Sequence, residues 1–246
     1  MIAKRHLDNA PIKEAIIDIQ IARNNDFDIK VFEQCYRKIK KDYPSTDSIN
    51  KGLLGFHFGS DSSMSTTMDQ QHAGYKYSSI DKKNIVQFRN NGFTFSRLEP
   101  YETWESMSTE AKKLWEIYKE TCNSCSISRI ATRYINVMRI PLPIKDFKLY
   151  LNSPPIIPET LPQGISSFLT RVVIQNPEIQ SQGIVTQALD RPEEGCAPIT
   201  LDIDIVKHGD YNIDENEFWT DLEKMRIFKN DIFFESITEK TAELFK

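Results

Sequence analysis

One helical pattern occurs twice in this chain of 246 residues. Residues 104–115 read WESMSTEAKKLW, and residues 234–245 read FESITEKTAELF. In both segments the apolar residues recur at spacings that place them on one face of a helix. Each such face needs a surface to pack against, so the repeat predicts a chain built from two similar halves.

Shorter matches keep the same order along the chain. IDI at 17–19 corresponds to INV at 135–137, and IKVF at 29–32 corresponds to IKDF at 144–147. Amphipathic helices resemble one another through their period alone. Three matches in the same order nevertheless favour an internal duplication.

The remaining segments fit one order of elements in each half. In the first half, β-branched and alternating residues predict strands, and a 3.6-residue period predicts helices. The polar segment 60–74 predicts a loop, and Asn91-Gly92 predicts a type I′ turn. The expected elements are a strand at 12–22, a helix at 26–43, strands at 52–59 and 74–80, a hairpin at 84–98 and a helix at 101–121.

The second half begins again with a long strand, which ends at prolines. The proline-rich segment 152–164 predicts a connection without regular structure. The expected elements are a strand at 127–143, a short helix at 144–151, strands at 167–175, 183–189 and 199–206, and helices at 214–228 and 230–245.

Each half therefore has the order β-α-β-β-β(-β)-α, which predicts an α+β fold. Residues 1–126 and 127–246 would form tandem repeats related by a pseudo-twofold axis and joined in one compact unit. Their strands would form one curved antiparallel sheet with helices on one face and the other face open. This order is similar to the saddle of the TATA-binding protein, an analogy of topology that implies no function.

Three motifs resemble a sporadically distributed, functionally uncharacterised family of prokaryotic proteins. The chain has the family patterns P-I-x-E-A at 11–15 and R-Y-I-N at 133–136, and FESIT at 234–238 resembles the third pattern, F-E-x-x-I-T, with one residue fewer between Glu235 and Ile237. The small residue usual in the central strand is Ala131 or Thr132 here. The resemblance spans nearly the whole chain. It implies no particular activity, and the family's distribution implies an association with mobile elements or phage-conflict loci.

Alternation along the first strand of each half predicts a groove on the open face. Glu14, Asp18 and Gln20 share one face of the first strand. The alignment of the halves places Tyr134 and Asn136 on the same face of the second. Together they form a hypothetical ligand or partner groove, although any half-solvated antiparallel sheet has a polar face.

Acidic residues offer an alternative interpretation. Asp202 and Asp204 share one face of their strand and would join Glu14 and Asp18 on the open face. Carboxylate oxygens are the ligands that Mg²⁺ and Mn²⁺ prefer. The alternative function is therefore a metal-dependent phosphodiesterase or nuclease.

A second set of residues is predicted to be structural. Alternation places Arg133 on the helix-covered face, where an unpaired charge is costly, so Glu105 or Glu235 is its expected partner. The aromatic stripes of the two matching helices are expected in the core: Trp104, Trp115, Phe234 and Phe245.

The familiar catalytic and cofactor motifs do not occur. The sequence has no Walker loop, no G-x-G-x-x-G and no G-x-S-x-G. Cys122 and Cys125 form a C-x-x-C without a second ligand pair, so we expect ordinary thiols and no zinc. No cofactor is predicted, and a non-enzymatic protein is favoured over an enzyme.

The charge balance and the hydropathy limit the classes of partner that the chain can have. The 31 basic and 35 acidic residues give a net charge of −4, without the basic excess of a duplex-DNA binder. No apolar run is long enough to span a bilayer, and four cysteines suit the cytoplasm as thiols. The sequence therefore predicts a cytoplasmic binding or regulatory protein whose partner is a basic or amphipathic polypeptide, and a homodimer is compatible with it.

Overall fold

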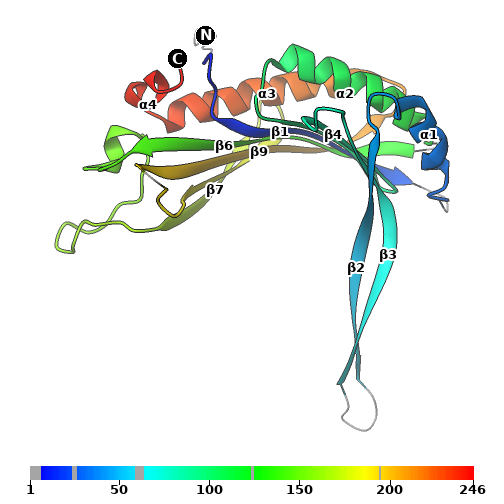
Figure 1. Ribbon diagram of the computed structural model, residues 1–246, viewed down its shortest axis with the longest axis horizontal. Helices are drawn as coiled ribbons and strands as arrows, with labels where there is room; N and C mark the ends of the chain where they lie inside the picture. Colours follow the sequence, from blue (N-terminus) through cyan, green and yellow to red (C-terminus); the bar gives the residue numbers. More distant parts are fainter. Residues whose placement is uncertain (1–6, 24–26, 59–63, 123–124, 194) are drawn as a thin grey trace.

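The computed structural model describes residues 7–23, 27–58, 64–122, 125–193 and 195–246. Nine strands in this part of the chain form one antiparallel sheet in the order β2-β3-β4-β5-β1-β6-β9-β8-β7. The helices α2 (Trp104–Lys119) and α3 (Glu217–Ser236) lie side by side on one face of the arched sheet (Figure 1). The α+β class and the single antiparallel sheet are confirmed. We call the face opposite α2 and α3 the open face.

The first half supplies five strands and two helices. α1 (Val31–Ile39) follows the first strand, and α2 ends the half. The strands are β1 (Ile12–Arg23), β2 (Ser45–Phe58), β3 (Met64–Ser78), β4 (Asn84–Arg89) and β5 (Gly92–Leu98).

The second half supplies four strands and its own helices. A single 3₁₀ turn, η1 (Phe147–Leu149), stands where the short helix was predicted. The strands are β6 (Cys125–Pro141), β7 (Phe168–Asn176), β8 (Ser181–Leu189) and β9 (Cys196–Asn212); α3 and α4 (Glu239–Glu243) close the chain.

The first strands of the two halves meet in the middle of the sheet. β1 pairs antiparallel with β6, so that Ala15 lies opposite Tyr134 and Asp18 lies opposite Ala131. β5 flanks this central pair on one side, and β9 flanks it on the other. One continuous ladder of backbone hydrogen bonds therefore runs through both halves.

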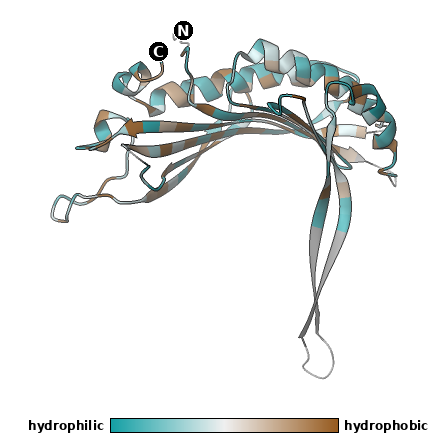
Figure 2. Ribbon diagram, in the orientation of Figure 1, coloured by the Kyte–Doolittle hydropathy of each residue, from teal (hydrophilic) through white to brown (hydrophobic). Residues whose placement is uncertain are grey.

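The core lies between the central strands and the helices. Apolar and polar residues alternate along these strands (Figure 2), and Ala15, Ile17 and Ile19 are fully buried, as predicted. Trp104 and Trp115 of α2 are buried as well. Burying an aromatic side chain of this size is worth about 2–3 kcal/mol. Trp115 packs against Phe93 of β5 and Phe218 of α3, so this stripe helps to hold α2 on the sheet and against α3.

The start of α2 is fixed by a side-chain cap. Thr103 has an extended backbone, and its hydroxyl accepts a hydrogen bond from the backbone N–H of Ser106 at 3.1 Å. Such a cap satisfies one of the N–H groups that a helix leaves without an acceptor in its first turn.

The second copy of the helical pattern does not form one helix. α3 ends at Ser236, Ile237 has an extended backbone and pairs with Leu151, and α4 begins after Thr238, whose hydroxyl accepts from the N–H of Thr241. The cap at Thr238 and the bridge at Ile237 therefore split the segment that the apolar spacing predicted to be one helix.

The predicted equivalence of the two helices is therefore wrong. Trp104 starts α2, whereas Phe234 lies near the end of α3, and Phe234 and Phe245 are only partly buried. Ile17 and Ile135 also differ, because Ile17 is fully buried and Ile135 is not. The expected burial is confirmed for Trp104 and Trp115 and is wrong for Phe234 and Phe245.

The polar segment 60–74 is not a single loop. Residues 64–74 belong to β3, which pairs with β2 from Ser45↔Ser78 to Phe58↔Met64; residues 59–63 lie outside the described part. The two strands form a long ribbon that projects on the side of the open face (Figure 1). Backbone pairing with β2 has outweighed the low strand propensity of these residues.

The β4–β5 hairpin turns one residue earlier than predicted. Arg89 pairs with Gly92, so the connection is Asn90-Asn91, and neither Asn91 nor Gly92 has a positive φ. Gly92 is required for another reason. A Cβ atom at this position would lie 2.4 Å from the carbonyl oxygen of Ile19 in the neighbouring strand.

Candidate functional site

Asp18 is the centre of an ion-pair network on the open face. One carboxylate oxygen accepts hydrogen bonds from Thr94 Oγ1 at 2.7 Å and from the Arg89 guanidinium. The other accepts from Arg129 Nη1 at 2.8 Å. Strands β1, β4, β5 and β6 each contribute one of these four side chains. Both oxygens of the Asp18 carboxylate are thus engaged in hydrogen bonds, donated by two arginines and one hydroxyl group.

Arg133 also lies on the open face, which corrects its predicted position. Its side chain is 44% exposed, and its Nε and Nη2 atoms donate to the two oxygens of Asp202 at 2.8 and 2.5 Å. Its partner is therefore neither Glu105 nor Glu235.

The register of the central strands explains the difference. Ile17 lies opposite Thr132 and Ile16 lies opposite Arg133. Directly opposed residues share a face, so from Arg129 onward the even-numbered residues of β6 face the helices and the odd-numbered ones face the open side. The alignment of IDI with INV had placed Ile17 with Ile135, one residue out of phase.

Tyr134 and Asn136 consequently lie in the helix-covered layer. They are 1% and 2% exposed. Asn136 Nδ2 donates to the backbone carbonyl of Leu201 at 2.9 Å and to that of Tyr134 at 3.2 Å. The predicted groove is therefore divided by the sheet, with Glu14, Asp18 and Gln20 on one side and Tyr134 and Asn136 on the other.

The acidic residues of the open face are matched by arginines. Burial raises the pKa of Asp204 above its usual value, and nearby Arg129 and Arg133 only partly oppose this effect. Within the described residues, no group of three or more His, Cys, Asp or Glu side chains is placed to hold a metal ion. Asp18, Asp202 and Asp204 thus belong to a charge-balanced array.

Sequence reasoning missed the arginines of this array. Arg129 and Arg133 are four residues apart in one strand, and the two-residue period places them on the same face. Arg89 precedes the β4–β5 turn and lies beside β1 only because the hairpin folds there. The spacing of Arg129 and Arg133 was therefore visible in the sequence, whereas the position of Arg89 beside β1 was not.

A pocket on the helix-covered side contains a buried lysine. Its volume is about 320 Å³, and its walls come from residues before β1, from β6, from the start of α2 and from α3. Lys229 of α3 is 7% exposed, and its Nζ lies 3.8 Å from the centre of the Tyr134 ring. Burial, together with nearby Arg226, lowers the pKa of Lys229 to about 7. We call this cavity the Lys229 pocket.

Tyrosine hydroxyls and a second cation surround this lysine. The hydroxyl groups of Tyr101 and Tyr134 lie 3.3 Å apart, and burial raises the pKa of both. Arg226 is 5.8 Å from the Trp104 ring, and its Nε donates to Glu223 at 3.0 Å. Arg226 thus has a carboxylate partner and Lys229 has none among the described residues.

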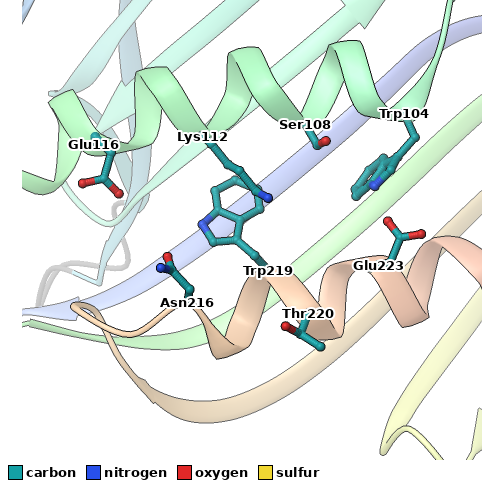
Figure 3. A pocket seen from close by; sticks show the side chains of 8 residues that line it. All are labelled: Trp104, Ser108, Lys112, Glu116, Asn216, Trp219, Thr220 and Glu223. Atoms are coloured by element: carbon teal, nitrogen blue, oxygen red, sulfur yellow. The ribbon is translucent and has the colours of Figure 1, made fainter.

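A second hollow lies between α2 and α3 (Figure 3). This α2–α3 groove has a volume of about 520 Å³, and Trp104 and Trp219 contribute its aromatic surface. Lys112 Nζ lies 5.4 Å from the Trp219 ring. Of its charged residues, Lys112 and Glu116 are exposed and Glu223 is half-buried, so the groove offers a solvated polar rim without a buried charge.

The outer strand β7 carries an exposed apolar surface. Six of the eleven exposed large apolar side chains of the described residues lie between residues 156 and 174. Four of them are on β7: Leu169, Val172, Val173 and Ile174. Within the described residues β7 pairs with β8 alone, so its other edge has no strand partner among them.

The cysteines and the helices say little about the kind of site that this protein has. Cys122 and Cys125 form no disulfide bond, nor do the other two cysteines. No helix in the described ranges has the length and apolar character needed to cross a membrane.

The fold and these surfaces define an α+β protein with a single arched sheet and one helix layer. A comparison with protein-family models and with curated proteins finds no match to the chain.

Proposed function

We propose that this chain is a non-enzymatic binding protein that captures an extended polypeptide segment along the free edge of β7. The apolar surface of this strand is the observation that carries the proposal. Leu169 and Val173 are on the open face, whereas Val172 and Ile174 are on the other face, and all four are exposed.

Such an edge is unusual in a protein without a partner. Edge strands are normally blunted by charges, prolines or bulges, because their unpaired backbone groups can pair with another chain. Within β7, the sequence FLTRVVIQN has one charged residue and no proline, and the β7–β8 register runs without a bulge. An added strand would gain backbone hydrogen bonds and apolar contacts on both faces.

The chemistry of the edge favours an amphipathic polypeptide over duplex DNA. Around the centre of the open face, Arg89 and Arg129 are engaged by Asp18, and Arg133 is engaged by Asp202. Few basic side chains remain there to replace counterions on a phosphate backbone. Apolar side chains at alternate positions of a peptide would instead match the exposed valines and leucine.

An internal duplication would account for the topology. The central pairing of β1 with β6, flanked by β5 and β9, is the order expected if two similar halves joined edge to edge. A saddle-like topology and a link to mobile elements or phage-conflict loci remain proposals based on sequence. The same holds for the cytoplasmic location.

The binding proposal can be tested with a displayed peptide library. Peptides selected on the immobilised wild-type protein should be enriched in alternating apolar residues. Leu169→Lys should weaken their binding at least about tenfold, as expected when a central apolar contact is lost. Ile80→Lys is the matched control, because Ile80 and Leu169 are both 74% exposed and Ile80 lies outside β7.

Either of two kinds of result would contradict the proposal. One is the absence of any enriched peptide class, or binding that Leu169→Lys leaves unchanged. The other is a stable homodimer in sedimentation that Leu169→Lys dissociates and Ile80→Lys does not, because β7 would then be an interface between two copies.

A further inference from the structure

In the part of the chain that the structure describes, no carboxylate compensates the charge of Lys229. Its ammonium group is buried between α3 and β6, and no acidic side chain of the described residues lies within ion-pair distance of its Nζ. Among the described residues, the close contact that offsets the charge is the face of the Tyr134 ring. A buried ammonium without a carboxylate partner is costly, so its persistence beside a cavity points to a partner supplied from outside.

Several neighbours of Lys229 inside the pocket are donors of hydrogen bonds or positive ends of dipoles. Arg226 adds a second positive charge, and the hydroxyls of Tyr101 and Tyr134 lie in the same pocket. Thr103, Trp104 and Glu105, at the start of α2, line the pocket as well. The first N–H groups of a helix have no intrahelical acceptor and carry a partial positive charge. The interior of the pocket thus favours a negatively charged group.

The rest of the wall is apolar. Leu7 and Ile12 contribute buried side chains from the segment before β1 and from its first residue, and Phe233 contributes a buried ring from α3. A volume of about 320 Å³ is at the small end of ligand cavities. The pocket therefore fits a small molecule with an apolar body and one charged end.

We propose that the Lys229 pocket binds a small organic monocarboxylate, with its carboxylate against Lys229 Nζ and the tyrosine hydroxyls and its apolar body against Ile12 and Phe233. This site is on the helix side and is independent of the β7 edge. A single negative charge matches the single unpaired cation. The acidic residues that also line the pocket, Glu102, Glu105 and Asp231, are exposed and would repel a dianion such as a phosphate monoester.

The proposal can be tested by NMR on protein labelled with ¹³C at the lysine ε-carbons, with phenylacetate and hexanoate as probes. In the free protein one lysine should titrate near the lowered pKa of about 7, and Lys229→Met should remove that resonance. A bound carboxylate favours the charged ammonium, so at least one probe should raise the midpoint by about one pH unit or more. Phenylacetamide, which has the same shape without the charge, should leave the midpoint unchanged.

A matched variant separates this site from other lysines. Lys112→Met removes an exposed lysine of the α2–α3 groove and should leave both the titration and the affinity for the probes unchanged. In calorimetry, Lys229→Met should weaken binding of the probe at least about tenfold.

Three results would overturn the proposal. The first is that neither carboxylate moves the midpoint of the wild-type protein, a measurement that depends on no variant. The second is an equal shift with phenylacetamide. The third is unchanged affinity of a folded Lys229→Met protein.

Discussion

The Nζ atom of Lys229 lies 3.8 Å from the centre of the Tyr134 ring, in the layer between α3 and the middle of the sheet. A desolvated cation over an aromatic face gains about 2 kcal/mol. Removing an ammonium from water costs several kcal/mol, so this contact offsets only part of the penalty. Lys229 therefore lowers the stability of the fold as long as it stays charged and unpaired.

We predict that Lys229→Met stabilises the protein at neutral and acidic pH. The pKa of Lys229 is about 7 in the folded state, against an ordinary value of 10.5. Between these values the unfolded chain binds more protons, so the stability of the wild type rises with pH across this window. At and below pH 7 the full penalty is present, and the variant should gain about 1–3 kcal/mol there.

Urea denaturation at about pH 6, 8 and 10 checks this prediction. The gain of Lys229→Met should shrink as the pH rises and should be smallest at the highest value, where Lys229 is neutral in the folded state and begins to lose its proton in the unfolded chain. Lys112→Met, in an exposed position on α2, should show no such dependence. A gain that is constant with pH would mean that better packing, not the charge, stabilises the variant.

The Asp18 network supports a second prediction. Asp18→Ala should cost about 2–3 kcal/mol, because it leaves Arg89 and Arg129 without their shared carboxylate. Asp202→Ala should cost less than about 1 kcal/mol, since the side chain of its partner Arg133 is 44% exposed and can be solvated by water. Chemical denaturation of the two variants side by side gives the comparison. Equal losses would show that the network adds nothing beyond a surface ion pair.

The burial of α3 residues supports a third prediction. Phe233 is 6% exposed and belongs to the core, whereas its neighbour Phe234 is partly buried. Phe233→Ala should cost about 3–4 kcal/mol, and Phe234→Ala about 1–2 kcal/mol. The two changes remove the same atoms, so the difference in unfolding free energy reports burial alone. A larger loss for Phe234 would place the helix in a different rotation on the sheet.

The layers of the fold could be predicted from the sequence because they depend on periodicity. The alternation of Ala15, Ile17 and Ile19 assigns a buried face to the first strand whatever its neighbour is. Trp104 and Trp115 similarly mark the buried face of α2. The side of β6 that faces the helices could not be fixed in this way, because it depends on register, and a shift of one residue exchanges Arg133 with Tyr134.

The site was harder to predict because its residues converge only in the folded chain. Lys229 occupies a position in line with Met225 and Phe233, four residues on either side along the buried face of α3. A lysine in an apolar stripe is the one signal that could have marked it. Nothing in the sequence brings Tyr101 to Tyr134, or Arg89 to Asp18, because those contacts follow from strand pairing and helix placement.

The last prediction concerns Asp204, which lies opposite Arg133 on the open face. Burial raises its pKa, and the carboxylates of Asp202 and Asp18 add to the effect. A carboxyl group whose pKa is raised by folding favours its protonated form in the folded state. Its contribution to stability is therefore present below the ordinary value of 3.8 and is lost as the pH rises through the raised pKa.

Asp204→Asn should accordingly stabilise the protein at about pH 7 by up to about 1 kcal/mol, and the gain should vanish near pH 3, where Asp204 is protonated in both states. Asp202→Asn is the control from the same strand. It removes one arm of the two-pronged pair with Arg133, so it should lose stability at neutral pH. If Asp204→Asn instead loses as much as Asp202→Asn, then the attraction of Arg129 and Arg133 for Asp204 outweighs its burial, and the raised pKa is disproved.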